Sequence, residues 1–233
     1  MKEKESSFIP EITALLRKAG EAVMDIYKSG DYNTESKADD TPLTKADKIS
    51  NLIITEGLKI ITPEIPVISE ESRLLPYETR KKYREVWILD PIDGTREFVD
   101  RNGEFCICLA LIRGRRPVAG FIMAPVTGKL WYATEGMGAF KQAGGKTSRL
   151  PLQEPPNPPV ILISRSHHNE TERKWIEKIK AEHNADVSIQ GSAIKFCHLA
   201  EGKASFYPKF GAINEWDVAA GDIILKEAGG SIT

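Results

Sequence analysis

The sequence lacks an excess of charge of either sign, because 32 Lys and Arg residues nearly balance 33 Asp and Glu residues. A clear basic excess is typical of nucleic-acid scaffolds and of proteins that bind anionic membranes, so the balance argues against both classes. It does not argue against a phosphorylated substrate, since bound metal ions can supply positive charge. We therefore expect no nucleic-acid partner.

Long hydrophobic runs are also missing. The longest unbroken apolar stretch is 105–112, far below the roughly 20 residues that a membrane-spanning helix needs. The opening residues 1–5 mix charges and contain no apolar segment of a secretion signal. We expect a cytoplasmic protein with no integral membrane segment. Peripheral association with the inner membrane stays open, as does the choice between monomer and homodimer.

Cysteine and histidine are scarce. Three cysteines at 106, 108 and 197 form no CxxC pair, and the four histidines show no zinc-type spacing. This spacing predicts no zinc site. Cys106 and Cys108 stand two apart in a strand-like run and face the same side of it, so we expect them to pack in the core rather than to form a disulfide.

The apolar periodicity predicts two helices, then an antiparallel-looking sheet, then alternating strands and helices. In the second helix, Leu52, Ile53 and Ile60 are expected to form an apolar stripe interrupted by Glu56. No periodic signal covers 31–42, and Gly144-Gly145 reads as a hairpin turn. The order of elements favours an α+β or α/β fold in layers. Helices are expected over 8–29, 44–61, 171–182, 193–200 and 216–228, and strands over 67–69, 86–89, 105–113, 117–124, 130–134, 139–142, 160–163, 187–190 and 204–207.

Five prolines within 151–159 make a stiff, extended connector. It predicts a division into an N-terminal subdomain, 1–150, and a C-terminal subdomain, 160–233. We expect the two to form one compact catalytic unit.

The residues best suited to bind a metal lie in the segment that runs from Trp87 to Thr95. A buried strand brings Asp90 to its end, Pro91 is expected to bend the chain out of the sheet, and Asp93-Gly94 forms a tight turn. Two carboxylates and the Ile92 carbonyl then gather around one point, which is how an Mg²⁺ site begins. An ordinary turn, with Asp93 capping its own backbone and Asp90 solvated, fits the spacing equally well.

Two further acidic features bear on the choice between a metal site and an ordinary turn. Glu70-Glu71 follows the expected strand 67–69, although a solvated glutamate pair explains it too. Asp217 falls in the first turn of the last helix, where a carboxylate also favours the helix dipole, and Asn214 is a candidate cap. The small residues 219–221 are expected to leave this helix start open to a phosphate.

These motifs together resemble the lithium-sensitive, magnesium-dependent phosphomonoesterases of the inositol monophosphatase superfamily. The pattern is an Asp, a Glu-Glu pair, Asp-Pro-Ile-Asp-Gly-Thr and then Trp-Asp-x-Ala-Ala-Gly, and it spans nearly the whole chain. Within the superfamily the sequence is most similar to the bacterial 3′(2′),5′-bisphosphate nucleotidases. The resemblance implies a layered α-β-α-β-α sandwich. The matching segments are Asp47 within 42–47, Glu70-Glu71, 90–95 and 216–221, and, for the nucleotidases, 36–39, 96–98, 101–105, 164–167 and 191–197.

The resemblance also implies a set of metal ligands. One Mg²⁺ would bind Glu70, Asp90 and the Ile92 carbonyl. A second would bind Asp90, Asp93 and Asp217, and Glu70 would also help to hold a weaker third ion. The ions would activate water and stabilise the leaving oxygen, with no covalent intermediate. Asp47 would accept a hydrogen bond from the Thr95 hydroxyl, which orients the water.

On the substrate side, the resemblance places the scissile phosphate near the N–H groups of Gly94 and Thr95. The base and ribose would lie near Ser164 and His167. The second phosphate would lie near Gly191, Ser192 and Lys195. Relatives commonly carry Arg after the Tyr-Pro pair of this region, where this chain has Lys209, which keeps the charge without the bidentate fork.

The implied activity is removal of the 3′-phosphate from adenosine 3′,5′-bisphosphate in sulfur assimilation, with the phosphosulfate analogue as a further substrate. Two alternatives stay open: an inositol or sugar-phosphate phosphatase, and a non-catalytic nucleotide sensor. Family members usually continue with another strand or hairpin beyond the last segment of this sequence, so we expect a less covered sheet edge.

Overall fold

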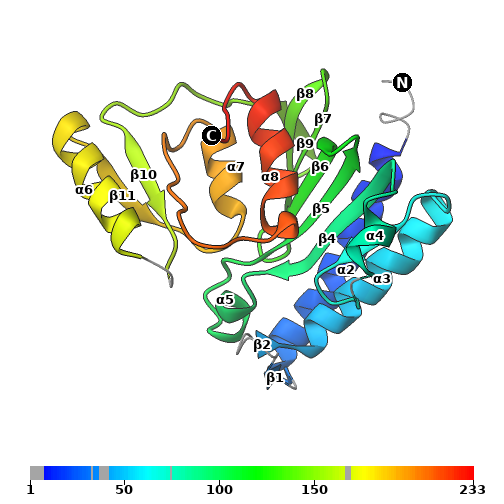
Figure 1. Cartoon of the computed structure of the whole chain (residues 1–233). Helices are drawn as coiled ribbons and strands as arrows, with labels where there is room; N and C mark the ends of the chain where they lie inside the picture. The colour runs from blue at the N-terminus through cyan, green and yellow to red at the C-terminus, as the bar shows by residue number, and fades with distance from the viewer. Residues whose placement is uncertain (1–7, 33, 37–41, 74, 166–168) are drawn as a thin grey trace.

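The computed structural model describes residues 8–32, 34–36, 42–73, 75–165 and 169–233. They form layers in the order helices, sheet, helices, sheet and helix (Figure 1). This arrangement confirms the expected α-β-α-β-α sandwich. The strand β4 (Glu85–Asp93) ends beside the short helix α5 (Thr95–Val99), which follows it directly in the chain (Figure 1).

The central layer is a seven-stranded sheet in the order β3-β4-β5-β6-β7-β8-β9. β3 runs parallel to β4, and every other neighbouring pair is antiparallel. The Gly144-Gly145 turn joins β8 to β9, a strand that the periodicity did not predict. The strands are β3 (Val67–Ser69), β4 (Glu85–Asp93), β5 (Cys106–Arg113), β6 (Arg116–Ala124), β7 (Lys129–Thr134), β8 (Gly138–Ala143) and β9 (Lys146–Arg149).

Two N-terminal helices cover one face of this sheet. They are α2 (Ile9–Ser29) and α3 (Lys45–Ile61), as expected. Gly30 ends α2 in the left-handed conformation, with φ of 74°. Thr44 caps α3 through a capping box. Between helices and sheet lies a core of fully buried side chains that include Ile12, Leu16 and Trp87.

The expected apolar stripe of α3 is wrong. Ile60 is 82% exposed and Leu52 is 55% exposed. The buried face instead carries residues four apart, Ala46, Ser50, Ile54 and Leu58. Small residues at 46 and 50 bring the helix close to β4, where the Ser50 hydroxyl donates a hydrogen bond to the Pro91 carbonyl at 2.8 Å.

Two other helices, α7 (Ile194–Ala200) and α8 (Glu215–Glu227), pack on the opposite face of the sheet. The small residues 219–221 have a different role from the one expected. They are buried, and a Cβ added at Gly221 would lie 2.4 Å from the Phe196 ring. They allow α8 to pack closely on α7 and the sheet, so they do not open the helix start to a phosphate.

The outer layers come from the segment after the Pro-rich connector. β10 (Val160–Ile163) and β11 (Asp186–Ile189) form a parallel pair covered by α6 (Glu170–His183). The strand expected over 204–207 is wrong. Phe206 makes an isolated bridge to Ile161, and Pro208, which lacks an N–H, follows shortly after. The subdomain boundary at 151–159 stays a prediction.

Short elements complete the fold. They are β1 (Glu35–Ser36), β2 (Pro42–Leu43), α4 (Tyr77–Arg80) and α5 (Thr95–Val99). β1 and β2 pair with each other, although no periodic signal over 31–42 predicted a strand there. Within the described residues, the helices are all too short or too polar to cross a lipid bilayer.

Candidate active site

Two carboxylates stand at the end of β4. The expected exit from the sheet at Pro91 is wrong, since β4 continues to Asp93, which pairs with Cys106. A register shift between Asp90 and Asp93 accommodates the proline as a bulge. The Ile92 N–H donates to Asp90 Oδ1 at 3.0 Å, and the Asp90 residue is only 2% exposed. The bulge thus brings both carboxylates to one edge of the sheet.

Two other elements bring acids to the same edge. Glu70 follows β3, and its N–H donates to the Leu89 carbonyl at 3.1 Å, which holds it beside the end of β4. Asp217 lies in the first turn of α8, where its Oδ2 accepts the Asn214 N–H at 2.9 Å. Asn214 is the capping residue of α8, as expected.

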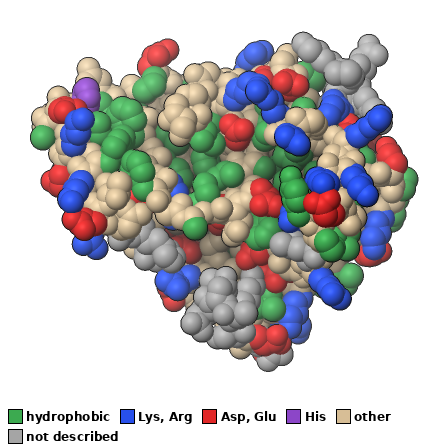
Figure 2. Space-filling view, viewed as in Figure 1, with side chains coloured by type: hydrophobic (Ala, Val, Ile, Leu, Met, Phe, Trp, Pro, Cys, Tyr) green, Lys and Arg blue, Asp and Glu red, His purple; other side chains and the backbone are tan. Residues whose placement is uncertain are grey.

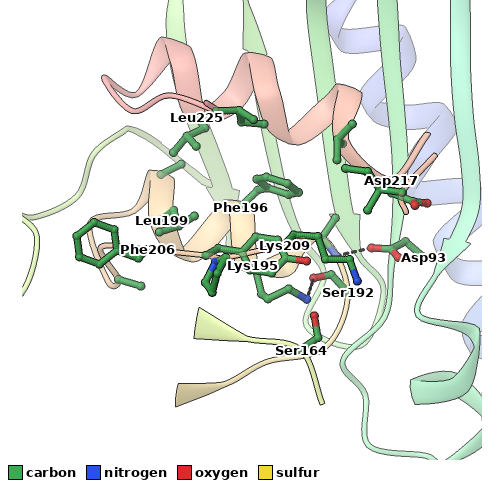
Figure 3. A pocket seen from close by; sticks show the side chains of 18 of the residues that line it. Asp93, Ser164, Ser192, Lys195, Phe196, Leu199, Phe206, Lys209, Asp217 and Leu225 are labelled. Carbon is green, nitrogen blue, oxygen red and sulfur yellow. Dashed lines mark hydrogen bonds between the residues drawn. The ribbon is translucent and has the colours of Figure 1, made fainter. Parts of the chain in front are cut away.

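These acids line a cavity of about 1230 Å³. Figure 2 shows a hollow on this face with acidic side chains around it. The close-up shows Asp93 and Asp217 at one end of the cavity and apolar side chains, Leu199 and Phe206 among them, at the other end (Figure 3). The cavity therefore has an acidic end and an apolar end.

The acidic end is electrostatically strained in the protein alone. Burial, then the charge of Asp93, raises the pKa of Asp90 well above its usual value, and Glu70 and Asp217 add to the rise. Burial raises the pKa of Asp93 to about 7, although Lys195 opposes that rise. Burial also raises the pKa of Asp217. Like charges brought together out of water favour protonation, or a cation, between them.

The donor set fits a hard divalent cation. Carboxylates that follow β3, end β4 and begin α8 line this one end of the cavity, and Mg²⁺ and similar ions prefer oxygen ligands. A bound cation would also offset the repulsion that, after burial, adds to the rise of these pKa values. Within the protein, the charge of Lys195 is the strongest influence that opposes the rise of the Asp93 pKa.

A hydrogen-bonded pair lies behind the carboxylates. The Thr95 hydroxyl is 3.2 Å from Asp47 Oδ1 and 3.1 Å from the Ile92 carbonyl oxygen, so it can donate to either. Asp47 is buried, and its Oδ2 accepts both the N–H and the hydroxyl of Thr44, at 2.8 and 2.6 Å. The expected contact between Thr95 and Asp47 is therefore present.

A buried cation faces the carboxylates. The Lys195 residue is 4% exposed, and its Nζ donates to the carbonyls of Gln190 and Ser192 at 3.1 and 2.7 Å. Its Nζ also lies 4.8 Å from the centre of the Tyr207 ring. Burial lowers the Lys195 pKa, an effect that Asp93 opposes. Figure 3 shows Lys195 between the acidic and the apolar ends.

Comparison with known proteins identifies the family. The sequence profile described as "Inositol monophosphatase family" matches residues 4–233. The chain belongs to the inositol monophosphatase family. The resemblance inferred from the motifs is thereby confirmed, and the family is one of metal-dependent phosphatases.

Individual relatives refine the comparison within this inositol monophosphatase family. The 3′(2′),5′-bisphosphate nucleotidase CysQ of Salmonella typhimurium is 40% identical over 227 residues, which cover 96% of this chain and 89% of the relative. The solved structure of CysQ from Bacteroides thetaiotaomicron is similar with a TM-score of 0.80 and 38% identity, covering 92% of this chain and 84% of that one. A Thermotoga maritima IMPase has a TM-score of 0.79 and 29% identity, over 98% and 84% of the two chains.

The structure brings most of the expected site residues of this inositol monophosphatase family member together. Asp47 and Ile92 stand behind the cavity wall and connect to it through Thr95. His167 lies outside the described residues. The expected residues that line the cavity are Glu70, Asp90, Asp93, Gly94, Thr95, Ser164, Gly191, Ser192, Lys195, Lys209 and Asp217.

The sequence did not indicate the structural role of Glu104 beside the site. Glu104 Oε2 accepts the Gly191 N–H and an Arg165 Nη2 hydrogen, both at 2.8 Å. A Cβ added at Gly191 would lie 3.0 Å from the Glu104 carbonyl oxygen, so this approach needs glycine. Glu104 thus fixes the 190–195 segment beside β4. The two partners are 87 residues apart in the chain, and no local pattern indicates such a contact.

Proposed function

We propose that this chain is a Mg²⁺-dependent phosphatase that removes the 3′-phosphate of adenosine 3′,5′-bisphosphate and releases AMP and phosphate. The observation that carries the proposal is that one cavity holds a carboxylate cluster and, facing it, the buried Lys195. The cluster suits a metal-assisted reaction at one phosphate. The lysine suits a second phosphate that is bound but not cleaved. The 40% identity to a bisphosphate nucleotidase supports the same substrate class.

The carboxylates divide into two sets of metal ligands. Glu70, Asp90 and the Ile92 carbonyl would hold one Mg²⁺, and Asp90, Asp93 and Asp217 a second, with Glu70 also helping to hold a weaker third. Bound there, the ions would make water acidic enough to attack phosphorus and would stabilise the leaving oxygen. These assignments come from the family resemblance. They are supported by the four acids that line one end of the cavity and by the raised pKa values of Asp90, Asp93 and Asp217.

Thr95 and Asp47 position the attacking water. Asp47 is held from behind by Thr44, so it is available as an acceptor for the Thr95 hydroxyl at 3.2 Å. When that hydroxyl donates to Asp47, its oxygen can accept a hydrogen bond from water at the cavity wall. The N–H groups of Gly94 and Thr95 would contact the scissile phosphate, which would receive attack without a covalent enzyme intermediate.

The rest of the cavity would hold the nucleoside and the second phosphate. Gly191, Ser192, Lys195 and Lys209 would contact the 5′-phosphate, and Ser164 and His167 would contact the base and ribose. The phosphosulfate analogue carries the same 3′-phosphate and would use the same site. The proposed setting is sulfur assimilation in the cytoplasm. Lithium sensitivity is expected from the resemblance.

A substrate panel tests the proposal. Phosphate release is measured with Mg²⁺ from adenosine 3′,5′-bisphosphate, inositol monophosphate and fructose bisphosphate, and the nucleotide product is identified by chromatography. We expect the nucleotide to have the highest kcat/KM, by about 100-fold, because a charged contact to a second phosphate contributes about 1.5–3 kcal/mol and the nucleoside adds to it. The product should be AMP.

Three outcomes would contradict the proposal. A preference for inositol monophosphate or fructose bisphosphate would favour the alternative phosphatase activity. Release of adenosine 3′-phosphate would show that the wrong phosphate is cleaved. Tight nucleotide binding without turnover in Mg²⁺ would instead support a nucleotide sensor.

A further inference from the structure

A pair of thiols lies directly beneath the acidic end of the cavity. Cys106 and Cys108 are alternate residues of β5, so both point to the face covered by α7 and α8. Their Sγ atoms are 3.7 Å apart, and both are free thiols. Cys106 Sγ is also 3.8 Å from Asp93 Oδ2 and 3.5 Å from Ser192 Oγ.

These distances match those between neighbouring ligand atoms in a tetrahedral zinc site. With Zn–S bonds of about 2.3 Å and Zn–O bonds of about 2.1 Å, a regular tetrahedron has S–S edges of about 3.8 Å and S–O edges of about 3.6 Å. The two sulfurs and the Asp93 oxygen all lie within 4.8 Å of one another. Small side-chain shifts would therefore place all three on one ion.

We propose that Asp93, Cys106 and Cys108 form a further metal site, separate from the Mg²⁺ sites, that binds a soft divalent cation of the Zn²⁺ type. The Ser192 hydroxyl or a water molecule would complete the tetrahedron. Thiolates select zinc-like ions over Mg²⁺, whereas the acidic end offers oxygen ligands alone. The sequence spacing predicts no zinc site because the third ligand comes from a different strand, across the β4–β5 pairing.

The ion would enter from the cavity. Cys106 and Cys108 are at most 1% exposed, whereas Asp93 and Ser192 line the cavity wall above them. The Ala193 N–H also donates to Asp93 Oδ2, and this bond holds the oxygen over the sulfurs. On binding, each thiol releases its proton to solvent and two sulfur–metal bonds form, so no oxidant or reductant is needed.

Sharing of Asp93 gives the site a consequence for activity. An ion held by the two sulfurs would engage a carboxylate that is also expected to hold Mg²⁺. Zinc-like ions should therefore inhibit phosphate release. This consequence, unlike the binding itself, rests on the proposed function.

Cobalt substitution tests the binding. Co²⁺ is added to the intact protein in the presence of excess Mg²⁺, without oxygen or added thiols, and the sulfur-to-cobalt charge-transfer band is recorded. We expect the band in the wild-type protein, its loss in C106S and C108A, and its retention in C197A. Cys197 is the matched control, because it is a buried free thiol in the same core but outside the group of three.

Absence of the band in the wild-type protein, or its retention in C106S and C108A, would overturn the proposal. Zinc-edge X-ray absorption of the wild-type protein loaded with one Zn²⁺ needs no variant that must fold. It should show two sulfur neighbours at about 2.3 Å, and a shell of oxygen alone would contradict the site.

An activity measurement separates this proposal from the proposed function. The Zn²⁺ concentration for half-inhibition should rise at least tenfold in C108A relative to wild type. Unchanged inhibition would show that the thiols do not mediate it. If the charge-transfer band is present but no phosphate ester is hydrolysed, the metal site stands and the proposed function fails.

Discussion

Burial decides what several single residues can do. Lys195 on its own reads as an ordinary surface lysine, yet the structure buries it beside Ser192 and Tyr207, opposite Asp93. The acids were found from the sequence, since Asp90 and Asp93 belong to one short motif. The burial of Lys195 depends on tertiary packing, so no local sequence pattern predicts it.

Replacing Lys195 tests its assignment to the second phosphate. In K195A we expect KM for adenosine 3′,5′-bisphosphate to rise at least tenfold, since a charge-assisted contact is lost. Phosphate release from a simple ester without a second phosphate should keep its kcat, and K195R should recover part of the affinity. An equal loss of kcat with the simple ester would contradict this role.

The raised pKa values predict how the metal-free protein responds to pH. The Asp93 pKa is raised to about 7 from 3.8, so the native state holds a proton that the unfolded chain has lost. The neutral, protonated Asp93 carboxyl is the form that the folded protein tolerates. Its contribution to the free energy of unfolding is therefore complete below about pH 4 and is lost as the pH rises through about 7. Thermal unfolding in EDTA should therefore show a fall in Tm between these pH values, and D93N should show a smaller fall.

The stabilisation by added Mg²⁺ should depend on pH in the opposite sense. It should raise Tm more at pH 8 than at pH 5, because only the ionised carboxylates bind the cation. Identical pH profiles for wild type and D93N in EDTA would show that Asp93 does not carry the effect.

At the scale of elements, the packing of α8 sets the position of Asp217. A Cβ added at Gly120 of β6 would lie 2.4 Å from Ile223 Cγ2 and 2.7 Å from the Ala220 carbonyl oxygen. The helix therefore rests directly on the strand. The sequence placed the bounds of α8 within one residue at each end, but it did not indicate this contact. The role of 219–221 was misread for that reason.

Enlarging Gly120 tests the close packing. We expect G120A to lower the free energy of unfolding by about 1–3 kcal/mol, since a backbone oxygen and a buried side chain must shift. G211A is the control, because its Cβ would meet nothing closer than 3.9 Å. The measurement is urea unfolding followed by circular dichroism. Equal stability of G120A and wild type would contradict the account of α8.

Elements with strong local signals were predictable, and those defined by pairing were not. The sheet strands from β3 to β8 and the helices α2, α3, α6 and α8 overlap the ranges expected from the sequence. The bulge at Pro91 was missed because only the pairing with β5 keeps the chain in the sheet. The face of α3 was misjudged because close packing on β4 selects small residues such as Ala46 and Ser50 over larger apolar ones.

At the scale of the whole molecule, the site exists because distant segments meet. Asp90 and Asp93 come from the central sheet, Asp217 from α8 near the end of the chain, and Lys195 from the start of α7. The order of motifs indicated that they belong together through a family resemblance. Their meeting in one cavity, and the tie from Glu104 to Gly191, needed the fold.

The central claim is that carboxylates from β4 and α8 act as one metal-holding cluster. It is tested most directly by the rate of phosphate release from adenosine 3′,5′-bisphosphate in saturating Mg²⁺ for D93N, D217N and the control D222N. Asp222 lies on the same helix as Asp217 but outside the cavity lining. Circular dichroism confirms that each variant is folded. We predict that D93N and D217N abolish turnover, since loss of one such charge removes several kcal/mol of transition-state stabilisation, while D222N keeps it. Retention of more than about a tenth of the wild-type rate in folded D93N or D217N would contradict the account.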